Sequence, residues 1–192
     1  MTHNGSMRAK DIAIVSVAMT LAALAAHGFT QELGDAERAK MIGQPAPELN
    51  VSGWTNTDGK ELSSADLKGK VVVLDFYSYG CSECMAAVPR DNAIYAKYKS
   101  QGFVFIGVHL TFDPNAHEAL LMESKFHDRV MKTQPFQFPA CDDKLPFSDS
   151  HSTNAIFHVT MMPTVIVIGR NGKIVCYDPP DLEKAIKSAL GG

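Results

Sequence analysis

The pattern of apolar and polar positions predicts a chain in which strands and helices alternate. Its strongest feature is an unbroken apolar run, Val71 to Leu74, of the kind found in strands covered on both faces. A stretch with helical spacing, Met85 to Tyr98, and a second apolar strand, Phe103 to Leu110, follow it. Together they predict a right-handed β-α-β unit, so the carboxyl ends of both strands lie at one edge of the sheet.

Further elements are expected on both sides of this unit. Before it, segments 49–54 and 59–62 flank Asp58-Gly59 and predict a β-hairpin, and residues 64–66 predict one helical turn. After it, Asp113-Pro114 starts a predicted helix that runs to Lys132. The remaining predicted elements are a strand over 136–143, a short helix over 154–159, two strands over 164–168 and 173–177, and a helix over 181–190.

The first 26 residues have the layout of a secretory signal peptide. Arg8 and Lys10 precede an almost uninterrupted apolar run over 12–26, and Ala23-Leu24-Ala25 is a candidate cleavage site. The run is shorter than the ~20 residues that span a bilayer, so a retained membrane anchor is the alternative. We expect residues 1–26 to direct export to the periplasm or a similar extracytoplasmic space and residues 27–42 to form a flexible lead. Residues 43–192 are expected to fold as one domain.

Composition excludes one class of partner. The chain has 192 residues, 45% of them hydrophobic, which suits one globular domain with a core. Its net charge of -3 and its pI of about 6.1 lack the basic surplus of nucleic-acid-binding proteins. No nucleic-acid partner is therefore expected.

Two cysteines spaced C-x-x-C, Cys81 and Cys84, stand where the first strand passes into its helix. Free N–H groups and the dipole at a helix start favour a thiolate, so Cys81 is expected to attack disulfides. Cys84, one turn further in, is expected to be poorly exposed and to resolve the mixed disulfide. Half a zinc site or a structural disulfide is the alternative, but neither Cys141 nor Cys176 belongs to a second such pair. The pattern predicts exchange with protein thiols and disulfides, with no metal and no cofactor beyond the Cys81–Cys84 disulfide.

Residues 66–84 resemble the thioredoxin superfamily, in particular its extracytoplasmic TlpA/ResA branch. Pro89 matches the helix-kinking proline of that branch, and Met162-Pro163-Thr164 is similar to its cis-proline element. The motif Tyr79-x-Cys81-x-x-Cys84, with 106–109 reading Ile-Gly-Val-His, is most similar to the thioredoxin-like domain of DipZ-type proteins.

This resemblance covers most of residues 43–190 and implies an α/β thioredoxin fold. The fold would be a mixed central sheet flanked by helices, with an N-terminal β-hairpin and a central αβ insertion. It also implies that the backbone of Met162, beside Pro163, faces the C-x-x-C pair and binds an extended substrate segment by strand addition.

The resemblance further assigns roles to residues around the thiols. Asp75 matches the thioredoxin-type acid, which would accept the proton of Cys84, although a satisfied structural acid is the alternative. Gly80 stands where family members commonly have tryptophan. The absence of the tryptophan ring is expected to leave the substrate-binding surface less shielded. Ser82 and Glu83 fill the x-x positions that tune the redox couple, and the negative charge of Glu83 favours a more reducing one. A glutamate that is common three residues after the second cysteine is replaced by Ala87.

Two further cysteines and one histidine are also candidate functional residues. Cys141 and Cys176 lie in apolar, strand-like contexts and are expected to be buried free thiols. An oxidising compartment leaves a second disulfide between them as the alternative. His109 falls at the same sheet edge as Cys81, where it either transfers protons or is an ordinary hydrogen-bonded side chain.

The sequence thus indicates an exported thiol-disulfide oxidoreductase. The resemblance implies a reductase recharged by a membrane electron-donor protein and serving cytochrome c maturation or disulfide repair. One alternative is a peroxiredoxin-like peroxidase, but Leu74 and Ser78 replace the proline and threonine of its Pro-x-x-x-Thr-x-x-Cys loop. The other is a non-enzymatic metal- or haem-handling module that uses the two thiols as ligands.

Overall fold

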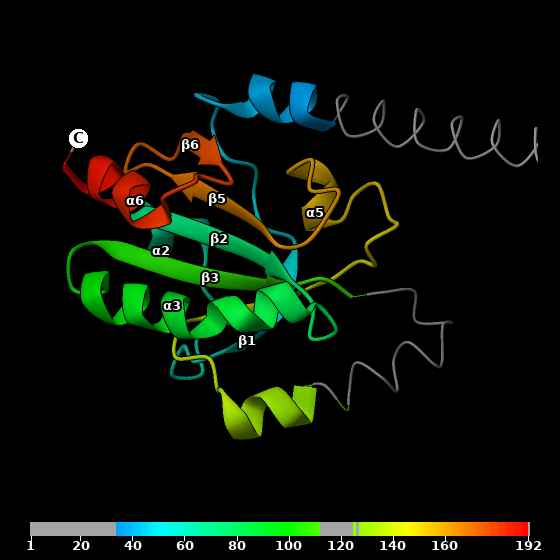
Figure 1. Cartoon of the computed structure of the whole chain (residues 1–192). Coiled ribbons are helices and arrows are strands. Elements are labelled where there is room, and N and C mark those ends of the chain that lie inside the picture. Colours follow the sequence, from blue (N-terminus) through cyan, green and yellow to red (C-terminus); the bar gives the residue numbers. More distant parts are fainter. Residues whose placement is uncertain (1–33, 112–124, 126, 192) are drawn as a thin grey trace, which may run out of the picture. The chain divides into compact units, whose positions relative to one another are not determined.

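The computed structural model in Figure 1 describes residues 34–111, 125 and 127–191. The chain divides into a first unit, Met1–Glu37, and a second, Arg38–Gly192, which holds the whole sheet. The predicted signal peptide and the predicted helix start at Asp113-Pro114 lie outside the described residues, and the domain boundaries stay predictions. Residues 34–41, within the predicted flexible lead, are helical. No helix in the described part of the chain is long and apolar enough to cross a membrane.

A mixed sheet of six strands, ordered β1-β4-β3-β2-β5-β6, forms the centre of the second unit. β2 pairs parallel with β3, and β3 pairs parallel with β4. The outer pairings, β1 with β4, β2 with β5 and β5 with β6, are antiparallel. The strands are β1 (Val51–Thr55), β2 (Val71–Tyr77), β3 (Phe103–His109), β4 (Ala140–Asp143), β5 (Thr164–Ile168) and β6 (Ile174–Tyr177).

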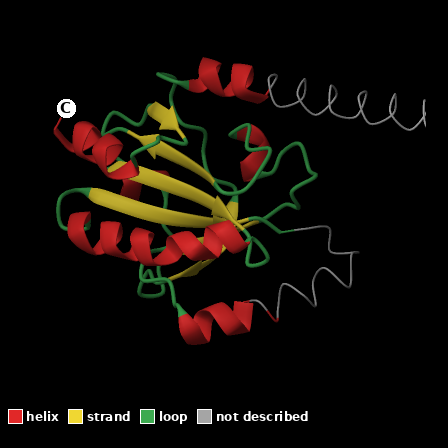
Figure 2. Cartoon of the chain, in the orientation of Figure 1, coloured by secondary structure: helices red, strands yellow, loops and turns green. Residues whose placement is uncertain are grey.

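Helices cover both faces of this sheet (Figure 2). They are α2 (Ser64–Leu67), α3 (Ser82–Tyr98), α5 (Thr153–Ile156) and α6 (Leu182–Gly191), and residues 127–133 are also helical. Side chains alternate along β2, so Val71, Val73 and Tyr77 pack with α3 and α6, and the even-numbered side chains pack with α2 and α5. Every residue of β2 is buried, as its apolar run predicts. The predicted α/β fold with a mixed, helix-flanked sheet is confirmed.

Most predicted elements are present, but the N-terminal hairpin is not. Residues 59–62 are in no strand, and β1 pairs instead with β4, whose Ala140 lies 85 residues after Thr55. Asn56, in the left-handed region with φ of 56°, donates hydrogen bonds to the carbonyl oxygens of Phe136 and Phe138 at 3.0 and 2.9 Å. These bonds tie the end of β1 to the segment before β4. The latter strand is shorter than the predicted span 136–143, and α5 ends before residue 159.

Candidate active site

The C-x-x-C pair lies where β2 passes into α3, with the arrowheads of β2 and β3 pointing toward the connecting loop (Figure 1). A tight turn makes this junction, because the backbone N–H of Cys81 donates to the carbonyl of Ser78 at 3.1 Å. Cys81 is the N-cap of α3, and the N–H of Cys84 donates to its Sγ at 3.2 Å. The two sulfurs form a disulfide, with the Cα atoms 5.3 Å apart. Cys81 is half-buried, whereas Cys84 is only 2% exposed.

Pro89 lies inside α3, as predicted from the sequence. A proline has no N–H, so it cannot donate to the carbonyl four residues earlier, that of Met85. The side chain of Gln134 supplies the missing donor, with Nε2 at 3.1 Å from this carbonyl oxygen. The carbonyl group of Met85 therefore keeps a hydrogen-bond donor, which comes from outside the helix.

The Met162–Pro163 peptide bond is cis, as the resemblance implied. Pro163 immediately precedes β5, and Thr164 at the start of that strand pairs with Phe76 near the carboxyl end of β2. The Met162–Pro163 element therefore lies at the sheet edge from which the C-x-x-C loop departs. Its role in binding substrate stays a prediction.

Asp75 interrupts β2 on the face that packs against α3. It lies between Val73 and Tyr77 in the alternation and so shares a layer with Cys84 and Val88 of α3. The side chain is buried, and its Oδ1 has no hydrogen-bond partner among the described residues. Burial raises the pKa of Asp75 well above its ordinary value, since desolvation disfavours the charged form.

A second buried carboxyl group, that of Asp91, was not predicted. It occupies the inward face of α3 together with Cys84 and Val88, and its Oδ1 accepts a hydrogen bond from Arg90 Nε at 2.9 Å. Its Oδ2 has no partner among the described residues, burial raises its pKa, and its charge adds to the rise in the pKa of Asp75. The spacing of Asp91 from Cys84 and Val88, seven and three residues, is the signal that could have placed it on the buried face.

The residues next to the thiols are exposed. Gly80, Ser82 and Glu83 all face solvent, the last two in the first turn of α3. A side chain at Gly80 would meet Ser78 Oγ at 3.6 Å, an ordinary contact, so the backbone does not require glycine there. The substrate-binding role of Gly80 and the redox-tuning roles of Ser82 and Glu83 stay predictions.

The other candidates, Cys141, Cys176 and His109, lie on strands of the sheet. Cys141 and Cys176 are both free, and only Cys141 is fully buried, so the prediction of two buried thiols was wrong for Cys176. The latter lies in β6, an edge strand of four residues, of which one is buried, one is exposed and two, including Cys176, are half-buried. His109 is buried at the end of β3 and donates from Nδ1 to Asp142 Oδ1 at 2.9 Å. Among the described residues, no group of three or more His, Cys, Asp or Glu could hold a metal ion.

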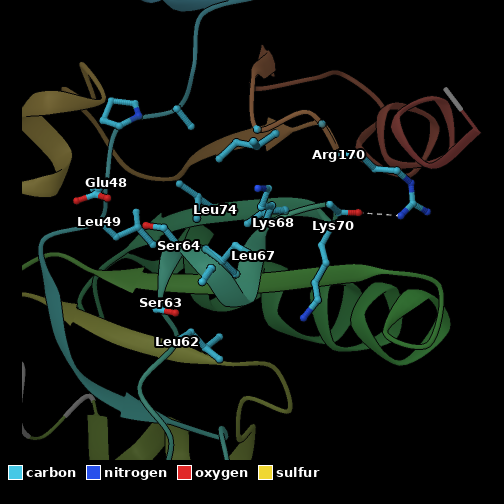
Figure 3. Close-up of a pocket in the computed structure, with 18 of the residues that line it drawn as sticks. Glu48, Leu49, Leu62, Ser63, Ser64, Leu67, Lys68, Lys70, Leu74 and Arg170 are labelled. Atoms are coloured by element: carbon cyan, nitrogen blue, oxygen red, sulfur yellow. Dashed lines mark hydrogen bonds between the residues drawn. The ribbon is translucent and has the colours of Figure 1, made fainter.

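Figure 3 shows a cavity of about 710 Å³. It lies on the opposite face of the sheet from Cys84. Val72 and Leu74 of β2 line it, together with the cationic side chains of Lys68, Lys70 and Arg170. Its lining residues, as far as the structure describes them, include no cysteine or histidine. The redox-active pair Cys81–Cys84 therefore lies at the sheet edge and does not line this larger cavity.

Comparisons with known proteins agree with this geometry. The model of the AhpC/TSA family matches residues 42–176. Thiol-disulfide oxidoreductase ResA of Bacillus cereus is 32% identical over 170 residues, which cover 86% of this chain and 87% of ResA. Protein DipZ of Mycobacterium bovis is 44% identical over 66 residues, but these are 33% of this chain and only 10% of DipZ.

Solved structures are similar over most of the chain. A thioredoxin-like superfamily protein aligns with a TM-score of 0.63 at 26% identity, covering 77% of this chain and 97% of that protein. A thiol:disulfide interchange protein of the thioredoxin family from Chlorobium tepidum aligns with a TM-score of 0.54 at 28% identity, covering 77% and 96%. The predicted resemblance is confirmed, and the chain belongs to the AhpC/TSA family, within which its relatives include ResA-type thiol-disulfide oxidoreductases.

Proposed function

We propose that this chain is an exported thiol-disulfide oxidoreductase that reduces disulfides of other proteins through Cys81 and Cys84. The asymmetry of the pair carries the proposal. Cys81 is half-buried at the N-terminus of α3, where its Sγ accepts a hydrogen bond from the N–H of Cys84, whereas Cys84 is 2% exposed. A helix N-terminus favours the thiolate form, so the accessible sulfur is also the more nucleophilic one.

The reaction moves two electrons in two steps. The Cys81 thiolate attacks one sulfur of a substrate disulfide, forms a new S–S bond with it, and releases the other substrate sulfur as a thiolate. Cys84 then loses its proton and attacks Cys81, which closes the intramolecular disulfide and releases the second substrate sulfur. The substrate is reduced, the Cys81–Cys84 pair is oxidised, and a dithiol partner must return two electrons before the next cycle.

Asp75 is proposed to take the proton of Cys84. It lies in the same layer as Cys84, beneath α3, and the pKa of its buried carboxyl is raised. A carboxylate formed there is a stronger base than an exposed one, which suits a general base for a buried thiol. The Met162–Pro163 element is proposed to align the substrate backbone at the same edge by strand addition.

Export and the electron donor are the finer parts of the proposal. The basic residues Arg8 and Lys10 before the apolar run 12–26 support secretion, and the resemblance of residues 66–84 to the extracytoplasmic TlpA/ResA branch supports a reductase outside the cytoplasm. A membrane electron-donor protein is the proposed source of electrons. Cell fractionation tests export, and protein that stays in the cytoplasm with its N-terminal segment intact would contradict it.

The reduction potential of the Cys81–Cys84 couple tests the chemistry and its direction. The purified protein is equilibrated with glutathione or dithiothreitol buffers, with Cys81→Ser as the control that has no couple. A potential near or below the ~-270 mV of thioredoxin supports a reductase, and one near ~-120 mV indicates an oxidant instead. The absence of any reversible couple would overturn the oxidoreductase proposal itself.

A further inference from the structure

A second cavity, of about 300 Å³, lies beside the C-x-x-C loop. It is at the carboxyl edge of the parallel strands, where Tyr77 of β2 pairs in register with His109 of β3, and His109 pairs with Asp142 of β4. Tyr79 also lines the cavity and stands only two residues before Cys81. The Cα atoms of Tyr79 and Cys81 are therefore at most ~7 Å apart. The cavity and the cis-proline element lie on opposite sides of β2 in the strand order. The lining residues are Gly53, Thr55, Tyr77, Tyr79, His109, His127, Ala140, Cys141 and Asp142.

Aromatic rings hold one wall of this cavity in place. The centroid of the Tyr79 ring lies 4.7 Å from the centroid of the His109 ring. It lies 4.8 Å from the centroid of the His127 ring, which it meets edge to face. The ring of Tyr77 meets the ring of Tyr79 edge to face, with the centroids 5.4 Å apart. The Tyr77 hydroxyl also donates a hydrogen bond to the Tyr79 hydroxyl at 3.3 Å. Tyr79 is thereby fixed by side chains from β2, β3 and the helix at 127–133.

A carboxylate forms the other wall. The side chain of Asp142 is 51% exposed, and its Oδ1 is oriented by the buried Nδ1 of His109. Its Oδ2 lies beside Gly53, where an added Cβ would stand 2.5 Å away, and the φ of +63° at Gly53 itself favours glycine at this point of β1. Among the described residues, no lysine or arginine lines the cavity or lies within ion-pair distance of Asp142.

We propose that this cavity binds an arginine or lysine side chain of the substrate protein, close to the disulfide that Cys81 attacks. Aromatic ring faces attract cations, and an exposed carboxylate adds a charge-assisted hydrogen bond. Glu83 in the first turn of α3 adds negative charge on the substrate side. The inference rests on the proposed function, because it names the class of substrate that the same site selects.

Three disulfide-linked peptides test the proposal with the reduced, full-length protein. They share one sequence and differ only two residues from the cysteine, where they carry arginine, glutamine or glutamate. The measured quantity is the rate constant for oxidation of the protein, followed by acid quenching and chromatography. We expect the arginine peptide to react roughly tenfold faster than the glutamine peptide, and the glutamate peptide to react more slowly than both. High salt should reduce the preference, since it screens exposed charges.

The ratio of the arginine to the glutamine rate should fall several-fold in Asp142→Asn, which keeps the shape of the side chain. Glu61→Gln is the matched control, because it removes one exposed charge outside the cavity and should leave the ratio unchanged. Equal rates for the three peptides with the wild-type protein, or an unchanged ratio in Asp142→Asn, would overturn the cavity proposal while the oxidoreductase proposal stands. If no peptide oxidises the protein, the proposed function fails instead.

Discussion

Substitution of Asp75 by asparagine should make the stability of the protein less dependent on pH. The asparagine keeps the shape of the carboxyl group, so the change removes one titrating group from the layer between β2 and α3. Burial, and then the charge of Asp91, raise the pKa of Asp75 well above 3.8 in the native state. In the unfolded chain the carboxyl group titrates near its ordinary value of ~3.9.

The sign and the size of the effect follow from this difference. The native stability that depends on protonated Asp75 is fully present below the unfolded pKa and is lost as the pH rises toward the native pKa. Within that window the unfolded state releases a proton that the native state retains, so the free energy of unfolding falls by ~1.4 kcal/mol per pH unit. Two pH units that lie wholly inside this window correspond to a loss of ~2.7 kcal/mol, which Asp75→Asn would not show.

Urea denaturation of the oxidised protein at pH 5, 6 and 7, followed by circular dichroism, measures this difference. Asp91→Asn is the companion variant. It removes the carboxyl group of Asp91, whose own pKa is raised, and the charge that adds to the rise in the pKa of Asp75, so it should also reduce the loss of stability between pH 5 and pH 7. Parallel pH profiles for the wild-type protein and Asp75→Asn would refute the reasoning, since they would mean that Asp75 releases its proton at the same pH in both states.

The remaining predictions concern the thiols and the core. Cys84→Ser should accumulate a mixed disulfide between Cys81 and a peptide substrate, seen as an adduct by mass spectrometry, and rapid loss of this adduct would contradict the resolving role of Cys84. Phe105→Ala, at a fully buried position, should lower the free energy of unfolding by ~3–5 kcal/mol in chemical denaturation, and a loss under ~1 kcal/mol would contradict tight packing there. Iodoacetamide should label Cys176 at least ~10-fold faster than Cys141 in the native oxidised protein, because burial raises the pKa of Cys141 further and shields it; equal rates would contradict this.

Local sequence patterns predicted the framework of the site. The apolar run of β2, the helix start at Cys81 and the strand at Phe103 are each visible within a few residues of sequence, and the handedness of the β-α-β unit places them at one edge. The cis bond at Pro163 came from family resemblance alone, since X-Pro bonds are cis in only ~5–6% of folded cases.

Features that depend on distant segments were not predicted. The partner of β1 is β4, and no local turn signal distinguishes that pairing from a hairpin. Asp142 reaches His109 from 33 residues away, so the carboxylate wall of the smaller cavity appears only once the strands are in register. Asp91 was missed because a charged residue on a helix is ordinarily assigned to the solvent side, and burying one requires compensation that sequence does not reveal.

The Sγ atom of Cys81 is both the attacking sulfur and the N-cap acceptor of α3. Replacing Cys81 can therefore affect exchange activity and helix stability separately. The N–H of Cys84 needs an acceptor at position 81 whether or not exchange occurs there. Serine is a preferred N-cap, so Cys81→Ser should abolish exchange and preserve the start of the helix. Cys81→Ala removes both the reactive group and the acceptor, at a cost of ~1 kcal/mol in helix stability. The serine variant should therefore lack exchange activity and keep the start of α3. A substrate that binds to this variant binds only through the surface around position 81.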